Sequence, residues 1–166
     1  MLKEKVLRLT KLRYETLPLL IEQMQISAKQ KQGDPVSQIL KCHLLSEVLL
    51  DKLLALALEP NGEAVLSAQL RYAQKLDIAS RSVLTEGFSV LPDFVVASLR
   101  QLNKIRNRLA HELGATVTKE DAVSLFSGSE PPPTIDLAEA DVVTLIYHYT
   151  PYIFGNMLPK YEDHAE

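Results

Sequence analysis

The sequence predicts an all-α protein, an up-and-down bundle of about five or six helices in a single domain over residues 1–166. Leu, Ala, Gln, Glu and Lys dominate the periodic segments, whereas the chain has no Trp and few of the β-branched or aromatic runs that strands need. The nine Pro and six Gly divide the chain into helical pieces. With 166 residues, 46% of them apolar and 23% charged, the chain can bury one core without disulfides.

The first helical periodicity covers residues 2–32, where Pro18 stands in the middle and leaves two alternatives, one kinked helix or two short ones. Residues 33–35, Gly-Asp-Pro, mark the next boundary, because Gly ends helices, Asp caps them and Pro suits their first position. We therefore expect the second main helix to run from Pro35 to about Leu58.

A turn at residues 59–62 separates this helix from a third one, which is expected from Ala64 to about Arg81. Pro92 begins a fourth helix with one apolar stripe, and Gly114 occupies the position of a left-handed C-terminal cap. The stripe consists of Leu99, Leu102, Ile105, Leu109 and Leu113. It makes this helix the clearest one in the sequence.

The remaining segments follow in short pieces. Residues 118–121 carry a capping box, Thr-Lys-Glu-Asp, before a short helix over residues 122–126. Residues 127–134 include the sequence SGSEPPP, so we expect an exposed and mobile loop there. The last helix is expected over about residues 136–157, with Pro151 as the site of a kink.

The charge balance and the residue types limit the classes of function. Eighteen Lys and Arg against 21 Asp and Glu give a net charge of -3, so a nucleic acid or an anionic membrane would have to bind a local patch. Cys42 is the only cysteine, which excludes an intramolecular disulfide and Cys-rich zinc sites. The chain has no Gly-rich phosphate loop, and His111 lacks the second His of a zinc-protease motif. We expect neither a metal nor a cofactor.

The sequence also favours a cytoplasmic protein. Its first residues, MLKEKVLRLTKLRYETLPLL, mix charges into every apolar stretch, unlike a signal peptide. The most apolar segment, Leu44–Leu58, contains Glu47, Asp51 and Lys52 and is shorter than the roughly 20 residues of a membrane span. We expect this segment to be a core helix.

A local cluster of cations lies in the fourth helix, where residues 99–114 read LRQLNKIRNRLAHELG. At 100° per residue, Arg100, Lys104 and Arg108 share one exposed side, which is either a surface that binds phosphates or an ordinary solvated face. Arg106 falls inside the apolar arc instead, where an unpaired guanidinium is costly. It needs a carboxylate, a dimer partner or a watery cleft.

Glu47 is the best candidate within the chain for the partner of Arg106, because it also lies among apolar residues of its helix. His43, Glu47 and Asp51 follow one another at four-residue spacing and therefore share one helix face. We expect this face to support Arg106.

Residues 106–111, Arg-Asn-Arg-Leu-Ala-His, resemble the signature of the HEPN superfamily (higher eukaryotes and prokaryotes nucleotide-binding). That signature is an Arg followed by a polar residue and, after four intervening residues, a His, late in a long helix of an α-helical bundle. The detailed resemblance covers residues 99–113. It implies an HEPN-like bundle that dimerises so that the Arg and His of both subunits line one cleft. Many members are metal-independent endoribonucleases of toxin, phage-defence or RNA-processing systems, and others bind without cutting.

The residue types suit this chemistry. RNA cleavage without a metal uses the ribose 2′-hydroxyl as nucleophile and needs a proton-transfer group and a fixed cation, which His111 and Arg106 supply. Asn107 is expected to orient the phosphate or the imidazole. Five residues of helix separate Arg106 from His111 by about 140°, so reach, fraying of the helix end or a two-fold related partner must bring them together.

Simpler interpretations stay open beside this one. Arg106 and Glu47 would then form no more than a buried ion pair, and His111 would be a helix C-terminal residue favoured by the macrodipole. The sequence thus predicts a metal-independent endoribonuclease or RNA-binding protein, a homodimer from a toxin, defence or stress system, with RNA and an antitoxin or other protein as partners. The alternative is a non-catalytic helical module for regulation, dimerisation or partner binding, including transcriptional regulation.

Overall fold

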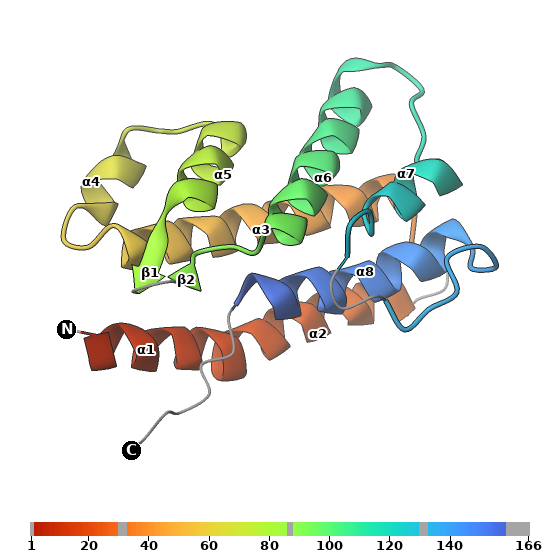
Figure 1. Ribbon diagram of the computed structural model, residues 1–166. Coiled ribbons are helices and arrows are strands. Elements are labelled where there is room, and N and C mark those ends of the chain that lie inside the picture. The colour runs from red at the N-terminus through yellow and green to blue at the C-terminus, as the bar shows by residue number, and fades with distance from the viewer. Residues whose placement is uncertain (1, 30–32, 86–87, 130–132, 159–166) are drawn as a thin grey trace.

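The computed structural model describes residues 2–29, 33–85, 88–129 and 133–158. Its first helices, α1 (Leu2–Lys11), η1 (Leu12–Thr16) and α2 (Leu17–Lys29), form one continuous rod in which η1 is a π-helical turn (Figure 1). A Pro ring clashes with the carbonyl of the fourth residue before it, which for Pro18 is Tyr14 within η1. The wider turn accommodates Pro18. Of the two alternatives, one helix or two short ones, the structure therefore has one helix, with a π-helical turn before the proline.

The long helix α3 (Pro35–Ala57) begins and ends close to its predicted limits. The carboxylate of Asp34 accepts hydrogen bonds from the backbone N–H groups of Val36, at 3.3 Å, and Ser37, at 3.1 Å. Six of its apolar residues are completely buried, and they supply the centre of the core: Ile39, Cys42, Leu49, Leu50, Leu53 and Leu54.

The third predicted helix, from Ala64 to Arg81, is wrong as one element. The structure has α4 (Gly62–Ser67) and α5 (Tyr72–Arg81), and Gln69 between them has a left-handed φ of 55°. The N–H of Arg71 donates to the side chain of Gln74 at 2.9 Å and so starts a new helix.

A short antiparallel hairpin follows, β1 (Val83–Thr85) and β2 (Phe88–Ser89). These strands were not predicted, because segments of two and three residues are too short to show an alternating pattern. The rest of the secondary structure is helical, so the all-α class is confirmed for the described residues.

Helix α6 (Asp93–His111) follows Pro92, as predicted, and Gly114 has a φ of 81°. Leu99, Leu102 and Ile105 are buried, whereas Leu113 is fully exposed. The prediction that Leu113 continues the buried stripe is wrong, because the backbone leaves the helix at Glu112, which has extended dihedrals.

The capping box of α7 (Lys119–Ser124) is confirmed, since the Thr118 hydroxyl accepts from Asp121 N at 3.1 Å and Asp121 accepts from Thr118 N at 2.9 Å. Helix α8 (Val142–Met157) starts later than predicted; Asp141 is its N-cap, and the Asp141 carboxylate accepts from the N–H of Thr144 at 2.7 Å. Pro151 lies inside α8. Of the loop expected at residues 127–134, residues 130–132 lie outside the described part, and its mobility stays a prediction.

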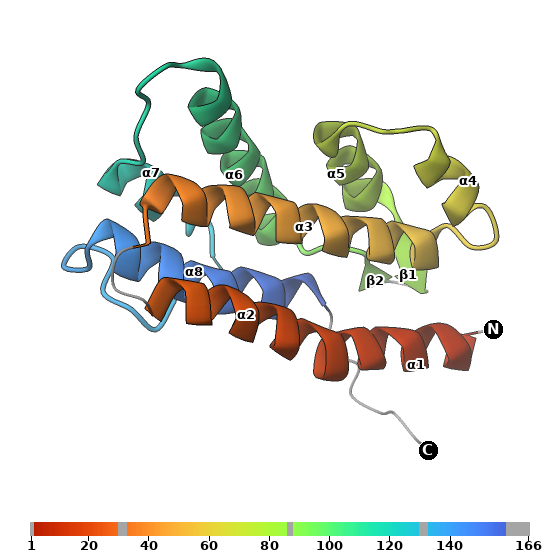
Figure 2. The same cartoon turned by 180° about the vertical axis from the view of Figure 1, so that it is seen from behind.

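Helix α3 lies between two groups of helices, as Figure 1 and Figure 2 show from opposite sides. Helices α2 and α8 pack together on one side of α3, and the antiparallel pair α5 and α6 stands across its other side. The C-terminal end of α6 projects away from α2 and α8 in both views. Among the described residues, no helix has both the length and the apolar character to cross a membrane.

Candidate functional site

Residues 106–111, the motif on which the expected function rests, lie in the last turns of α6, at its projecting end. His111 is the last residue of the helix and is exposed, whereas Arg106 and Asn107 are half-buried. The guanidinium of Arg106 donates from Nη1 to Oδ1 of Asn107 at 3.1 Å. Arg106 and His111 are thus held on one helix with different exposure, about 140° and ~7.5 Å apart along it.

The predicted ion pair between Glu47 and Arg106 is wrong. Glu47 Oε1 accepts from Nζ of Lys75 at 3.0 Å, and Asp51 Oδ1 lies 2.8 Å from the same ammonium. Lys75 is buried on α5, the helix that packs beside α6 against α3. It therefore reaches both carboxylates, and within the described residues no carboxylate forms an ion pair with Arg106.

His43 connects the α3 face to α6. Its Nε2 lies 3.1 Å from Oδ1 of Asn103, and its ring packs on Tyr72 with centroids 4.2 Å apart. Burial lowers the pKa of His43, and the hydrogen bond to Asn103 raises it by less; the charges of Arg106, which lowers the pKa, and Glu47, which raises it, have smaller effects. A neutral imidazole that donates from Nε2 to Asn103 fits this environment.

The three cations predicted to bind phosphate have different surroundings. Arg100 is exposed and lies 3.9 Å from Asp77 of α5, and Lys104 is exposed. Arg108 instead donates from Nη2 to Asp121, the carboxylate that also caps α7. Arg100 and Lys104 are therefore open to an anionic ligand, whereas Arg108 joins α6 to α7.

Three residues of this region were not anticipated from the sequence. Lys75 neutralises Glu47 and Asp51. Asn103 forms a hydrogen bond with His43. Arg81 is a further cation, on α5, and lies 3.3 Å from Asp77. The four-residue spacing of Asn103 and Asn107 was visible, but it does not tell which helix lies opposite. Only the packing of α3, α5 and α6 supplies these partners.

The chemistry open to this site is acid–base and electrostatic. An exposed imidazole can donate or accept a proton, and a guanidinium without a carboxylate partner can bind an anion. No group of three or more His, Cys, Asp or Glu residues in the described part of the chain is arranged to hold a metal ion.

The arrangement around Arg106 and His111 is known from the structure of this chain alone. Comparisons with family models, with curated proteins and with solved structures each return no match for the chain.

Proposed function

We propose that this protein binds and cleaves RNA without a metal, as a homodimer of HEPN type, through Arg106, Asn107 and His111 of α6. The observation that supports it most is the unpaired state of Arg106: it is half-buried, its described partner is the neutral Asn107, and Lys75 occupies the carboxylates nearby. A partly desolvated cation without a counter-ion favours binding of an anion such as a phosphate.

The proposed reaction is a transesterification. The ribose 2′-hydroxyl loses its proton to a base and attacks the adjacent phosphorus, the P–O5′ bond breaks, and the O5′ leaving group takes up a proton. The products are a 2′,3′-cyclic phosphate and a 5′-hydroxyl. His111 transfers a proton, and Arg106, oriented by Asn107, stabilises the charge that builds up on the phosphoryl oxygens.

Dimerisation at the end of α6 would complete the site. Leu113 is fully exposed there, and Leu109 is half-buried. A second copy of α6 would cover Leu113 and bring its own His111 towards Arg106, which the spacing along one helix does not allow. The exposed cations Arg100 and Lys104 would then hold the RNA strand on either side of the cleft.

The test is incubation of the purified protein with mixed RNA in the presence of EDTA. Positioned proton transfer is worth roughly 100-fold or more, so His111→Ala should lose at least this much activity. His148→Ala is the matched control, because His148 is an exposed helical histidine on α8. Equal cleavage by the wild type and His111→Ala would assign the activity to another site or to a contaminant.

A second candidate function is a non-catalytic interaction module. Leu40, Leu44 and Val48 are exposed at four-residue spacing on α3 and form an apolar stripe. A protein partner, such as an antitoxin or a regulator, would cover this stripe. Wild-type protein that neither cleaves nor binds RNA would favour this second function.

A further inference from the structure

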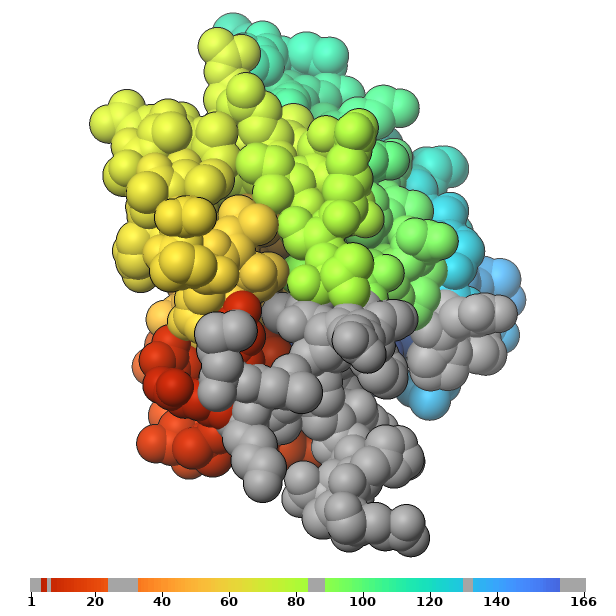
Figure 3. Space-filling view, turned by 60° about the vertical axis from the view of Figure 1, so that its left-hand side comes forward, coloured from red at the N-terminus to blue at the C-terminus, as the bar shows by residue number. Residues whose placement is uncertain are grey.

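A cavity of about 380 Å³ lies between α1 and the C-terminal half of α3, and no residue of α6 lines it. Its volume is within the range of about 300–1,000 Å³ that is typical of small-molecule sites. The residues that define its two long walls are Lys11, Leu12, Thr16, Lys52, Ala55 and Leu56. Figure 3 shows the residues of α4 and the end of α3, in yellow, lying above the residues of α1, in red.

Specific contacts hold this cavity open. Arg8 Nη1 donates to Oε1 of Glu59 at 2.6 Å, which connects α1 to the turn after α3, and Lys5 Nζ lies 3.9 Å from Oε2 of Glu59. Gly62, at the start of α4, packs so closely on α3 that a Cβ there would lie 2.4 Å from the carbonyl oxygen of Ala55. These contacts fix both walls, so the cavity is preformed.

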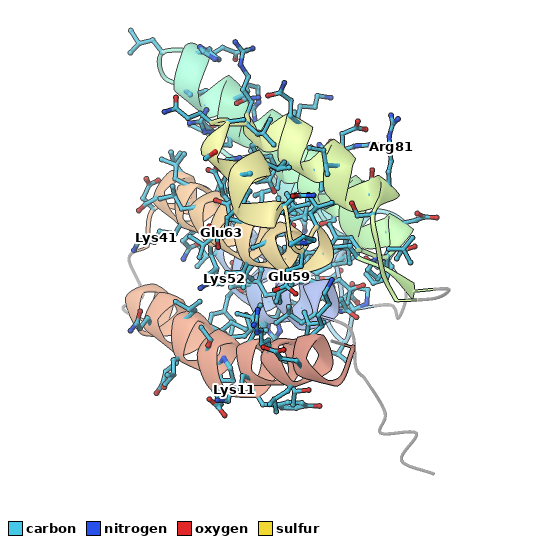
Figure 4. All side chains as sticks on the ribbon, turned by 90° about the vertical axis from the view of Figure 1, so that its left-hand side faces the viewer. Lys11, Lys41, Lys52, Glu59, Glu63 and Arg81 are labelled. Carbon is cyan, nitrogen blue, oxygen red and sulfur yellow. The ribbon has the colours of Figure 1, made fainter. Side chains whose placement is uncertain are left out.

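The charges around the cavity favour an anion. Arg8, Lys11 and Lys52 line it together with two carboxylates, Glu59 and Glu63. Arg8 and Lys5 already neutralise Glu59, while Glu63 is exposed on α4. In the described part of the chain neither Lys11 nor Lys52 forms an ion pair. Figure 4 shows Lys52 on α3, Glu59 in the turn that follows α3, and Lys11 on the rod below them.

The wall between these lysines is apolar and includes the irregular turn of the first rod. Leu12 is 7% exposed, and Ala55 and Leu56 are half-buried. Leu12 and Thr16 are the two ends of the π-helical turn η1, and such turns occur frequently at functional sites. The Thr16 hydroxyl offers a hydrogen-bonding group beside the apolar wall.

We propose that this cavity binds a small organic anion. Its charged head, a carboxylate, sulfonate or phosphate, lies between Lys11 and Lys52, and its apolar body packs on Leu12 and Leu56. This site is separate from the RNA site proposed on α6 and does not depend on it.

The experiment is fluorescence titration with 8-anilinonaphthalene-1-sulfonate, an anion with an apolar body, and in parallel with N-phenyl-1-naphthylamine, which lacks the sulfonate. We expect saturable binding of one sulfonate probe per chain. Replacing both lysines, Lys11→Gln with Lys52→Gln, should raise its Kd roughly tenfold at low salt and leave the Kd of the neutral probe unchanged.

Two further variants make the result specific. Arg71→Gln with Lys119→Gln removes the same charge from exposed positions outside both the cavity and the RNA site proposed on α6, and should leave both Kd values unchanged. Ala55→Phe fills the cavity and should abolish binding of both probes. Non-saturable binding, an equal effect in the two charge variants, or unchanged binding in a folded Ala55→Phe protein would overturn the proposal. If Ala55→Phe does not fold, the comparison of the two charge variants decides alone.

Discussion

Lys75 is the residue on which the polar contact between α3 and α5 depends most. Its side chain is 10% exposed, and its ammonium lies 3.0 Å from Glu47 and 2.8 Å from Asp51. Burial lowers the pKa of Lys75, but the hydrogen bonds and charges of Asp51 and Glu47 outweigh burial, so the net pKa is raised. The two carboxylates therefore stabilise a positive charge in a place that water scarcely reaches.

Lys75→Met keeps most of the aliphatic stem and removes this charge. Breaking a fully buried pair costs about 3–5 kcal/mol, and an exposed pair about 0–1 kcal/mol. The carboxylates are 33% and 39% exposed, so water solvates them in part once Lys75 is gone. We expect the free energy of unfolding to fall by about 2 kcal/mol near pH 7, with a drop in Tm of about 4–8 °C for a chain of this size.

Urea and thermal unfolding of matched variants measure this loss. Lys104→Met is the control, since it removes an exposed lysine and should change the free energy of unfolding by less than about 0.5 kcal/mol. Adding Glu47→Gln and Asp51→Asn to Lys75→Met should restore part of the loss, because it removes the two carboxylates left without a counter-ion. A Lys75→Met protein as stable as the control would refute the reasoning, and so would a triple variant less stable than Lys75→Met.

Three other predictions concern His43 on α3, the start of α4 at Gly62, and the end of α6. Because burial lowers the pKa of His43, the unfolded chain binds a proton near pH 6.5 that the folded chain does not bind. The free energy of unfolding should therefore fall as the pH is lowered from about 7 to 5, and it should fall less in His43→Gln. Urea unfolding at each pH measures both. Gly62→Ala should cost about 1–3 kcal/mol in urea unfolding, because its Cβ meets the backbone of Ala55, whereas Gly155→Ala, with nothing within 4 Å, should cost nothing. Leu113→Ser should weaken dimerisation in sedimentation experiments while monomer stability changes by less than about 0.5 kcal/mol; an unchanged dimer would place the interface elsewhere.

The parts of the fold that were predictable are those with a local chemical signal. The Asp34–Pro35 start of α3, the capping box of α7 and the left-handed Gly114 each depend on a few adjacent residues, and all three are present. The break between α4 and α5 has no such signal, because a glutamine, Gln69, adopts the positive φ there. The start of α8 was placed too early, because Asp136 and Asp141 both cap a turn and only the second begins the helix.

The candidate site was predictable to the level of helix faces. The 100° spacing correctly predicts that Arg100 and Lys104 are exposed and that His43 and Glu47 share one side of α3. The two are close enough for the charge of Glu47 to raise the pKa of His43. It could not say that α5 lies between this face and solvent and supplies Lys75. Nor could it show that Asp121 engages Arg108, since that contact joins two helices across a loop. Partners follow from packing, which a helical wheel does not contain.

This exchange of partners changes what a mutation of Arg106 would mean. Had Glu47 depended on Arg106, removing the guanidinium would have left a buried carboxylate unpaired, and lost stability would have been confused with lost catalysis. Since Lys75 neutralises Glu47, Arg106→Gln breaks one hydrogen bond to Asn107 and leaves no carboxylate without its cation. The free energy of unfolding of this variant is therefore expected to lie within about 1 kcal/mol of the wild-type value. A loss of RNA cleavage in such a protein reports on the guanidinium itself, whereas a loss of more than about 3 kcal/mol would show that Arg106 serves the α3–α6 contact after all.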